Sequence, residues 1–270
     1  MTRGLLKVAA SLLLLAFLLI GVSYSMLRSY GRSNPSSAAG RAPGSEVRKI
    51  GKEINIVELN GPIDLTLTQG DTPYMKVRGE QRLLGNVETA LDGNTVHIGP
   101  KGMLLHHRLP LQVVMVLPDL RELNVHGSGD ATVNGFSGEK FKLALHGSGN
   151  VTFNGRYKNL AAGVHGTGDL NLNAGNSENV ALEMVGSGQI TSSGSCKTLN
   201  AELTGSGDLD AQHLASDQVS VNLNGSGTTA VFAKQKADLT LRGSGDIRVH
   251  GNPDNRNVSR TGSGEVTWDQ

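Results

Sequence analysis

The sequence predicts an all-β fold, a parallel β-helix of about eight coils of 18–20 residues, and two observations lead to this prediction. The first is a tripeptide, Gly-Ser-Gly with one Gly-Thr-Gly variant, which begins at Gly127, Gly147, Gly166, Gly186, Gly205, Gly225, Gly243 and Gly262. The second is that apolar residues alternate with polar ones on both sides of the tripeptide. A repeat of this length cannot bury its apolar face alone, so the copies must stack as a solenoid.

The alternation gives each coil its strands. Two positions before the first glycine lie Val125, Leu145, Val164, Met184, Leu203, Leu223 and Leu241. Four positions after it lie Val151, Leu170, Ile190, Leu209 and Ile247. A period of two is typical of a strand with one buried face. We therefore expect two short strands per coil that meet at the tripeptide, with a looser return at sites such as Asn134-Gly135.

Residues 1–30 are expected to be a signal peptide or a membrane anchor. Arg3 and Lys7 precede an apolar run over residues 8–22, which is the layout of a secretory signal. The run is long for a signal peptide and short for a membrane span of about 20 residues, so cleavage after Ser25 and retention as an anchor both stay open. The positive charges ahead of the run predict that the rest of the chain crosses the membrane.

The next two segments differ in composition. Residues 31–46 are rich in Gly, Ser, Ala, Pro and Arg, and we expect a flexible linker. Residues 47–121 lack the tripeptide but are β-rich, with strand-like runs at 54–59, 63–68, 74–78, 95–98 and 111–117. This part is either a sandwich-like lead-in or a set of irregular first coils. Because Pro118-Asp119-Leu120 enters the first repeat without a linker, we favour one continuous domain.

Residues 122–270 hold the repeats and end in a predicted cap. Arg260 takes an inward position in the last coil, and Trp268, the single tryptophan, lies two residues from the end. A terminal repeat needs an atypical outer face that stops further stacking. We interpret Arg260 and Trp268 as that cap.

The charge and the cysteine content argue against a nucleic-acid-binding protein, a disulfide-stabilised protein and a lipoprotein. The formal net charge is +1 and the charged residues are scattered, which argues against a nucleic-acid partner, because such a protein carries a basic stripe. Cys196 is the single cysteine, so no disulfide can form within the chain and its stability must come from the stacked core. A lipid-modified cysteine after the apolar run is excluded for the same reason.

Several motifs carry a family resemblance. They are Asp64-Leu-Thr-Leu-Thr-Gln-Gly-Asp, Thr89-Ala-Leu-Asp-Gly-Asn-Thr-Val-His-Ile, the junction Val116-Leu-Pro-Asp-Leu-Arg-Glu-Leu-Asn-Val-His-Gly-Ser-Gly-Asp, and the serial Gly-Ser-Gly-Asp coils. Over about residues 47–268 the chain resembles the head GIN domain family of putative auto-transporter adhesins, a bacterial domain of unknown function. The resemblance implies an exported β-helical protein and carries over no functional residues. Many relatives look like lipoproteins, from which this chain departs.

Stacked coils place equivalent residues above one another in columns, and three columns at or beside the tripeptide carry polar side chains that could bind or react. The position before the tripeptide holds His126, His146 and His165 in three successive coils. Stacking brings these imidazoles to about 5 Å, close enough for two or three to share Zn²⁺ or Cu²⁺. No acidic or cysteine ligand accompanies them in the column, so we favour a polar ladder and assign no metal site.

The other two columns favour structural roles. The residue after the tripeptide is Asp130, Asn150, Asp169, Gln189, Asp208, Thr228, Asp246 and Glu265, an alternation that we interpret as avoided charge repulsion. Its spacing does not fit calcium-binding repeats. The central hydroxyls are Ser128, Ser148, Thr167, Ser187, Ser206, Ser226, Ser244 and Ser263. A catalytic serine is single and needs a general base, so this repetition indicates a turn ladder.

These observations favour a non-enzymatic, exported cell-envelope protein with a structural or binding, adhesin-like role. We expect a periplasmic or cell-surface location, membrane contact through the N-terminal segment, an unknown protein or glycan partner, and no nucleic acid. The alternative is a polysaccharide-acting β-helix enzyme or a lectin-like glycan binder. An enzyme needs long insertions that build a cleft, whereas the repeat length varies by only two residues. We expect no catalytic, cofactor-binding or metal-binding residues.

Overall fold

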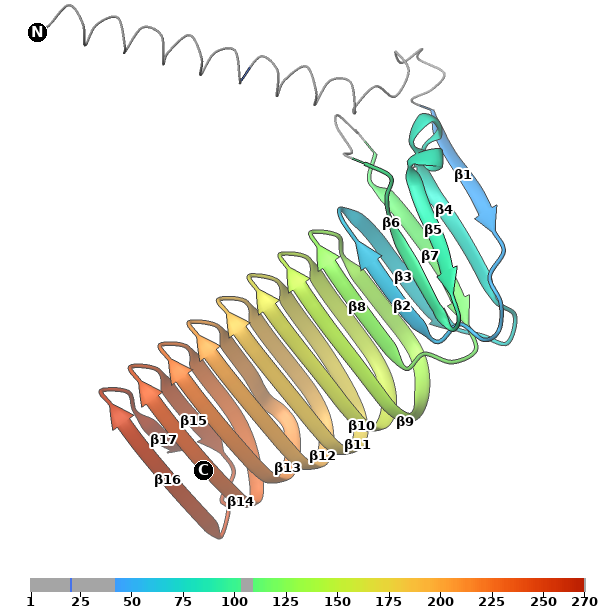
Figure 1. Cartoon of the computed structure of the whole chain (residues 1–270). Coiled ribbons are helices and arrows are strands. Elements are labelled where there is room, and N and C mark those ends of the chain that lie inside the picture. Colours follow the sequence, from blue (N-terminus) through green and yellow to red (C-terminus); the bar gives the residue numbers. More distant parts are fainter. Residues whose placement is uncertain (1–19, 21–41, 103–108, 270) are drawn as a thin grey trace, which may run out of the picture.

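A computed structural model describes residues 20, 42–102 and 109–269. Its seventeen strands join into one sheet that winds as a parallel β-solenoid (Figure 1), which confirms the predicted fold class. Among the residues described, no helix is long and apolar enough to cross a membrane. The predicted signal or anchor over residues 1–30 lies outside the described residues, apart from residue 20.

The regular coils are built from long strands. The elements are β8 (Glu122–Gly127), β9 (Ala131–Gly147), β10 (Asn150–Gly166), β11 (Asp169–Gly186), β12 (Gln189–Gly205), β13 (Asp208–Gly225), β14 (Thr228–Gly243), β15 (Asp246–His250), β16 (Asn255–Gly262) and β17 (Val266–Asp269). Each of β9–β14 runs from one tripeptide to the next and bends near its middle (Figure 1). We call the part after the tripeptide the leading half and the part before the next tripeptide the trailing half. Stacked in parallel, the halves form a leading sheet and a trailing sheet.

The prediction of two short strands joined by a loose return is wrong in one respect. The strand continues around the bend, where its pairing with the neighbouring coil shifts register, for example between Asn154 and Arg156. In some coils a glycine with positive φ eases the bend, as at Gly135 (+84°) and Gly175 (+61°). Neighbouring coils bend at the same place, so the backbone groups on both sides of the bend keep partners in the next coil.

Backbone stacking explains the tripeptide. The first glycine of each copy has a φ between +122° and +147°, a conformation that favours glycine. A Cβ atom on Gly225 would lie 1.9 Å from the carbonyl oxygen of Gly205, and one on Gly227 would lie 2.0 Å from that of Gly207. Successive turns are joined by hydrogen bonds such as Ser226 N–H to Gly205 O at 2.9 Å. The close approach of the turns therefore requires both glycines.

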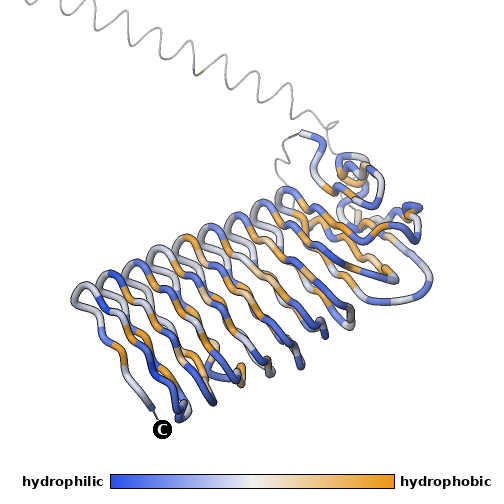
Figure 2. The backbone as a smooth tube through the Cα atoms, turned by 60° about the horizontal axis from the view of Figure 1, so that its bottom comes forward, coloured by the Kyte–Doolittle hydropathy of each residue, from blue (hydrophilic) through white to orange (hydrophobic). Residues whose placement is uncertain are grey.

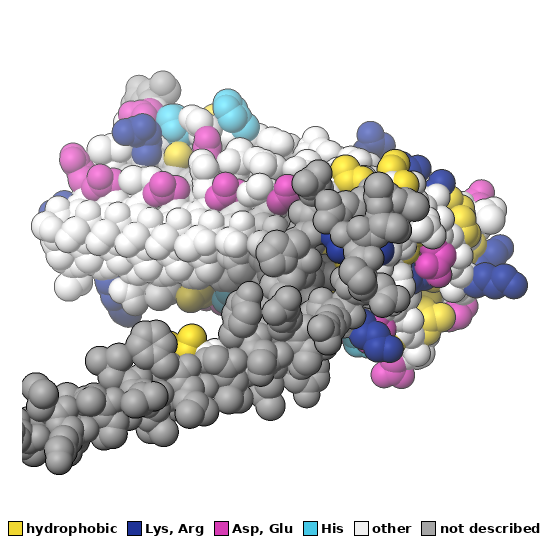
Figure 3. Space-filling view, turned by 90° about the horizontal axis from the view of Figure 1, so that it is seen from above, with side chains coloured by type: hydrophobic (Ala, Val, Ile, Leu, Met, Phe, Trp, Pro, Cys, Tyr) yellow, Lys and Arg dark blue, Asp and Glu magenta, His cyan; other side chains and the backbone are white. Residues whose placement is uncertain are grey.

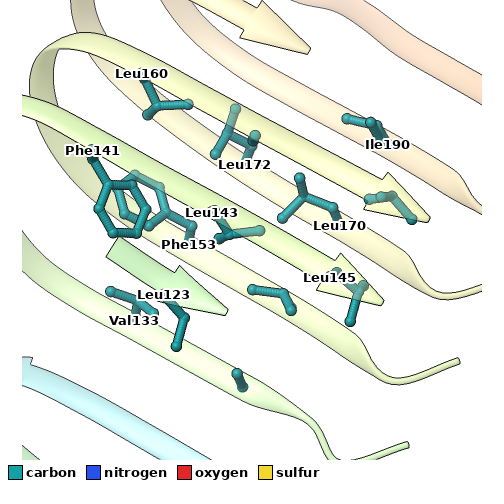
Figure 4. Close-up of a cluster of buried hydrophobic side chains, with 14 of the residues drawn as sticks. Leu123, Val133, Phe141, Leu143, Leu145, Phe153, Leu160, Leu170, Leu172 and Ile190 are labelled. Carbon is teal, nitrogen blue, oxygen red and sulfur yellow. The ribbon is translucent and has the colours of Figure 1, made fainter. Parts of the chain in front are cut away.

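The core lies between the two sheets and is continuous along the axis. The inward residues of β9–β14 are buried, and Figure 2 shows hydrophobic and hydrophilic residues alternating along the strands. In one section, the ring of Phe141 stacks on that of Phe153 with centroids 4.7 Å apart (Figure 4). Burial stabilises by roughly 25 cal/mol per Å² of apolar surface, so these stacked columns are the main source of stability.

The lead-in contains β1 (Pro43–Arg48), β2 (Ile56–Asn60), β3 (Ile63–Gln69), β4 (Tyr74–Glu80), β5 (Val87–Asp92), β6 (Thr95–Pro100), β7 (Leu111–Leu117) and the 3-10 helix η2 (Gln81–Asn86). Its stacking order differs from its chain order. The coil of β2 and β3 lies between the coil of β6 and β7 and the coil of β8 and β9, and it pairs in parallel with both. β4 adds to β7, and β1 adds to β4, both antiparallel.

The expectations for this segment differ from the structure in two places. The five strand-like runs correspond to β2, β3, β4, β6 and β7, but β5, which pairs antiparallel with β6, was not among them. Residues 43–46, expected to belong to the linker, are part of β1, which pairs with β4, and residues 31–41 lie outside the described residues. All seven strands belong to the same sheet as the regular coils.

The last coil, β16 and β17, carries charged side chains at its open end. Arg260 donates a hydrogen bond from Nη1 to the carbonyl oxygen of Gly264 at 3.1 Å. The guanidinium carbon of Arg256 lies 4.6 Å from the ring centroid of Trp268, a cation–π distance. Inward-pointing charges on an edge strand oppose pairing with a further strand, so these residues suit the predicted cap.

Candidate binding face

The trailing sheet carries a shallow trough on its solvent side. It consists of three adjoining hollows of about 650, 220 and 710 Å³; the first two lie side by side over β9–β12, and the third continues over β12–β16. The first and second share Ala161, Ala181 and Asn200, and the second and third share Asn200 and Glu202. The hollows therefore form one trough that crosses the strands and runs along the solenoid axis.

Small side chains form the floor of the trough. Gly163 pairs with Ala144 in the next strand, and Ala161 pairs with Ala181. A Cβ atom on Gly163 would meet no atom closer than 3.5 Å, and its φ lies outside the left-handed region. Packing therefore does not require glycine at this position, in contrast to the tripeptide glycines.

Polar side chains border the floor on the side of the bend and at the first coil. Asn179 donates a hydrogen bond from Nδ2 to Oδ1 of Asn159 at 2.7 Å. Lys142 forms an ion pair with Glu122, with Nζ 3.2 Å from Oε1. These groups offer amide donors and acceptors beside an apolar floor, an arrangement suited to a ligand with alternating polar and apolar edges.

Two carboxylates line the trough, and their negative charges are not neutralised by an ion pair within the described residues. Glu183 and Glu202 pair in successive strands, and neither has an ion-pair partner within the part of the chain that the structure describes. Like charges directly opposite each other destabilise a sheet. The pair therefore favours a ligand that donates hydrogen bonds or carries positive charge.

The three histidines form a stacked ladder beside the trough, and His165 lines its second hollow. The ring centroids of His126 and His146 lie 4.8 Å apart with planes at 4°, and those of His146 and His165 lie 4.7 Å apart at 12°, close to the expected 5 Å. Partial burial, followed by the neighbouring charges of His165 and His126, lowers the pKa of His146. Within residues 20, 42–102 and 109–269, no group of three or more His, Cys, Asp or Glu side chains is arranged to hold a metal ion.

The residues that follow the tripeptide, which we call the acidic column, form hydrogen bonds between coils, and these bonds explain why aspartate recurs there. Oδ1 of Asp208 accepts from the N–H of Thr228 at 2.8 Å, and Oδ1 of Asp169 accepts from the N–H of Gln189 at 3.1 Å. The N–H of Asp208 itself donates to the carbonyl oxygen of Gly188 at 3.0 Å. An aspartate in every second coil thus caps the backbone of the next. Figure 3 shows acidic side chains in a row along the solenoid.

The tripeptide hydroxyls and the single cysteine lie away from the trough. The hydroxyl column is exposed on the turns, where Ser263 donates from Oγ to Oγ of Ser244 at 3.1 Å. Cys196 is buried with Sγ 3.2 Å from Oγ of Ser216. Burial raises the pKa of the Cys196 thiol, so this residue is a poor nucleophile at neutral pH.

Sequence reasoning named the columns beside the tripeptide and missed the trough. The missed residues are Ala144, Ala161, Gly163 and Ala181, which lie outward in three successive strands. The available signal was the occurrence of small residues at outward positions where neighbouring coils place Glu, Asn or Thr. The alternation pattern sorts residues into inward and outward, but it does not show which outward residues leave a hollow.

Comparisons with known proteins agree with the fold. The sequence matches the family model described as "Putative auto-transporter adhesin, head GIN domain" over residues 55–253. No curated protein matches. Similar solved structures include a putative adhesin from Parabacteroides distasonis, with 23% identity, a TM-score of 0.80, and coverage of 85% of this chain and 98% of that one. A putative lipid binding protein from the same species has 24% identity, a TM-score of 0.77, and coverage of 84% and 97%.

A third similar structure is a putative adhesin from Parabacteroides merdae, with 18% identity, a TM-score of 0.78, and coverage of 84% of this chain and 96% of that one. At these identities the likeness concerns the fold. The family model spans most of the chain and confirms the resemblance found in the sequence. The chain belongs to the head GIN domain family of putative auto-transporter adhesins, which supports an adhesin-like, binding role.

Proposed function

We propose that this chain is an exported, non-enzymatic binding protein of the bacterial cell envelope, and that the trough of the trailing sheet holds its partner. The trough floor carries this proposal, because Gly163 is small where packing does not require it and the residues beside it are alanines. A hollow that stacking alone does not explain is the part of this regular surface best suited to a ligand.

The partner that fits is a linear glycan lying along the solenoid axis. The trough is elongated across successive coils, so a chain-like ligand meets one set of contacts per coil. Its hydroxyls can donate to Glu183 and Glu202, and its ring C–H faces can pack on the methyl groups of Ala161 and Ala181. Family membership supports the adhesin-like part of the proposal, and the glycan is our extension of it.

A catalytic alternative rests on one observation. Glu183 and Glu202 are carboxylates in successive strands, and glycoside hydrolases use paired carboxylates. Both side chains are exposed on an open surface, whereas catalysis of this kind needs an acid whose pKa is raised in a water-poor site. Incubating any bound glycan with the protein and measuring the released reducing ends separates the two functions, because a binding protein releases none.

The binding test uses the full chain, purified in mild detergent, on an array of envelope and extracellular glycans. Ala181→Arg fills the trough, and Asn171→Arg places the same side chain at an exposed position in the leading half of the same strand. We expect Ala181→Arg to lose binding to the glycans that wild type binds, and Asn171→Arg to retain it. Equal binding by wild type and both variants, or binding to no glycan, would refute the trough as a glycan site.

Export has its own test. An alkaline phosphatase fused after residue 41, ahead of β1, is active only when that point lies outside the cytoplasm. The sequence pattern of residues 1–30 predicts an active fusion. An inactive fusion together with full-length protein in the cytosol would overturn the proposed location.

A further inference from the structure

The outer face of the leading sheet changes character toward the N-terminal end of the solenoid. In β10–β12 the outward positions of the leading halves are Asn, Thr, Asp, Gln and Ser only. Strand register continues the same columns through β3 into β7, β4 and β1. There the outward residues include Val47, Tyr74, Lys76, Arg78, Val114 and Val116, which we call the lead-in patch.

The patch is both apolar and accessible. Val47 and Tyr74 are 61% and 37% exposed, and Val114 and Val116 are partly exposed. Within residues 42–102 and 109–269, six large hydrophobic residues are exposed, and four of them lie in the lead-in. Figure 3 shows that hydrophobic side chains, mixed with basic and acidic ones, are exposed toward the end of the molecule that carries β1–β7. A patch of this kind marks a contact surface.

The charges of the patch are positive and uncompensated. Lys76 and Arg78 have no ion-pair partner among the described residues, and the neighbouring outward residues Ser45 and Gln112 are neutral. Glu80, two positions beyond Arg78, is buried and paired with Arg82. Valine and tyrosine beside unpaired cations form the combination that suits an anionic lipid surface, where each cation contributes attraction and the tyrosine ring sits at the interface.

The chain also brings this patch close to a membrane. The apolar run of residues 8–22 ends twenty residues before β1, the outer strand of the patch. A Gly- and Ser-rich connection of that length has an expected end-to-end distance of roughly 25 Å. With the run in the bilayer, β1 stays within reach of the headgroups, while the trough lies on the other sheet and begins at β9.

We propose that the lead-in patch lies against an anionic lipid surface and so orients the solenoid on the membrane with its trough turned toward the partner. The inference rests on the part of the proposed function that places residues 1–30 in a membrane. It adds a second, electrostatic contact to that anchor. The anchor holds the chain at the membrane, and the attraction of the basic patch to anionic headgroups sets how the solenoid lies on the surface.

The test uses the full chain reconstituted in vesicles of phosphatidylcholine with or without phosphatidylglycerol, in a Cys196→Ala background. An environment-sensitive fluorophore is attached at Gln112→Cys, beside the patch, or at Thr191→Cys, on the same sheet face in a regular coil. Lipids carrying a headgroup-level quencher then report contact. We expect quenching at Gln112→Cys in vesicles that contain phosphatidylglycerol, and none at Thr191→Cys.

The charge variant sharpens the result. Lys76→Gln with Arg78→Gln should lower the docking equilibrium constant by roughly 30-fold, the equivalent of about 1 kcal/mol for each cation. Circular dichroism checks that the variant is folded. Equal quenching at both positions, no quenching at either, or quenching that ignores phosphatidylglycerol and the charge variant would overturn the inference. A probe shift that grows with protein concentration in the absence of lipid would assign the patch to a second copy of the chain instead. An inactive phosphatase fusion would refute export, and the quenching measurements in vesicles would not depend on that outcome.

Discussion

The regular coils and the lead-in bury the same kind of core with different turns. In β9–β14 each turn is the tripeptide, and its glycines approach the turn below so closely that a Cβ atom would collide with a carbonyl oxygen. The coil of β2 and β3 turns through Gly61-Pro62 instead, with Gly61 at a φ of +84°, and its strands still pair with β8 and β9. Coil formation therefore depends on strand pairing and buried columns, and the tripeptide serves the close stacking of turns.

The largest expected effect comes from the feature that both regions share. Leu223 in β13 and Val113 in β7 are fully buried, so Leu223→Asp and Val113→Asp should each lower the free energy of unfolding by about 4 kcal/mol, because an unpaired charge enters the core. Asn222→Ser, at the neighbouring exposed position, should be nearly silent, because it adds no charge opposite Glu202. Urea unfolding followed by circular dichroism measures all three, and a small loss in only one region would show that the cores differ.

A second comparison separates the regions. Gly225→Ala should lower the free energy of unfolding by about 3 kcal/mol, because its φ of +147° and the nearby Gly205 oxygen exclude a methyl group. Gly85 in the lead-in has no atom within 4 Å of its added Cβ, so Gly85→Ala should change the free energy by less than about 0.5 kcal/mol. Melting temperatures of the two variants decide this, and equal losses would contradict the stacking argument.

Smaller effects come from the acidic column of the regular coils. Asp208→Ala removes the acceptor for both the N–H and the Oγ1 of Thr228 and should destabilise by about 1 kcal/mol. Gln189→Ala, at a neutral position of the same column, should cost little. Denaturant midpoints measure both variants. A larger loss for Gln189→Ala than for Asp208→Ala would contradict the hydrogen-bond explanation and favour avoided charge repulsion as the reason why Asp alternates with neutral residues.

The smallest effect concerns pH. The pKa of His146 is lowered in the folded protein, so the unfolded chain binds more protons below its ordinary value of 6.5. The contribution of the neutral imidazole is complete above about pH 6.5 and is lost as the pH falls through the folded pKa. His146→Asn should therefore flatten the fall of melting temperature between pH 7 and pH 5. An unchanged profile would show that the ladder does not resist protonation.

The sequence predicted the repeating part of the molecule better than the rest. Alternation around the tripeptide identified inward residues such as Leu223 and Leu241, because a repeat presents the same evidence several times. The stacking of β2 and β3 between later strands was not predictable, since Asn60-Gly61-Pro62 indicates a turn but not its neighbour in space. The trough was not predicted from the sequence, because Gly163 and Ala161 differ from the other outward residues only in leaving space above the sheet.

The most direct test of the trough asks where a bound glycan sits. In a Cys196→Ala background, Ala181→Cys and Asn171→Cys place single exposed thiols on the trailing and leading sheets of β11. The rate of alkylation by a maleimide is measured for the full chain with and without a glycan selected on the array. The account predicts that the glycan slows alkylation at Ala181→Cys and leaves Asn171→Cys unchanged. The same alkylation rate at Ala181→Cys with and without the glycan, or protection of Asn171→Cys alone, would contradict the account.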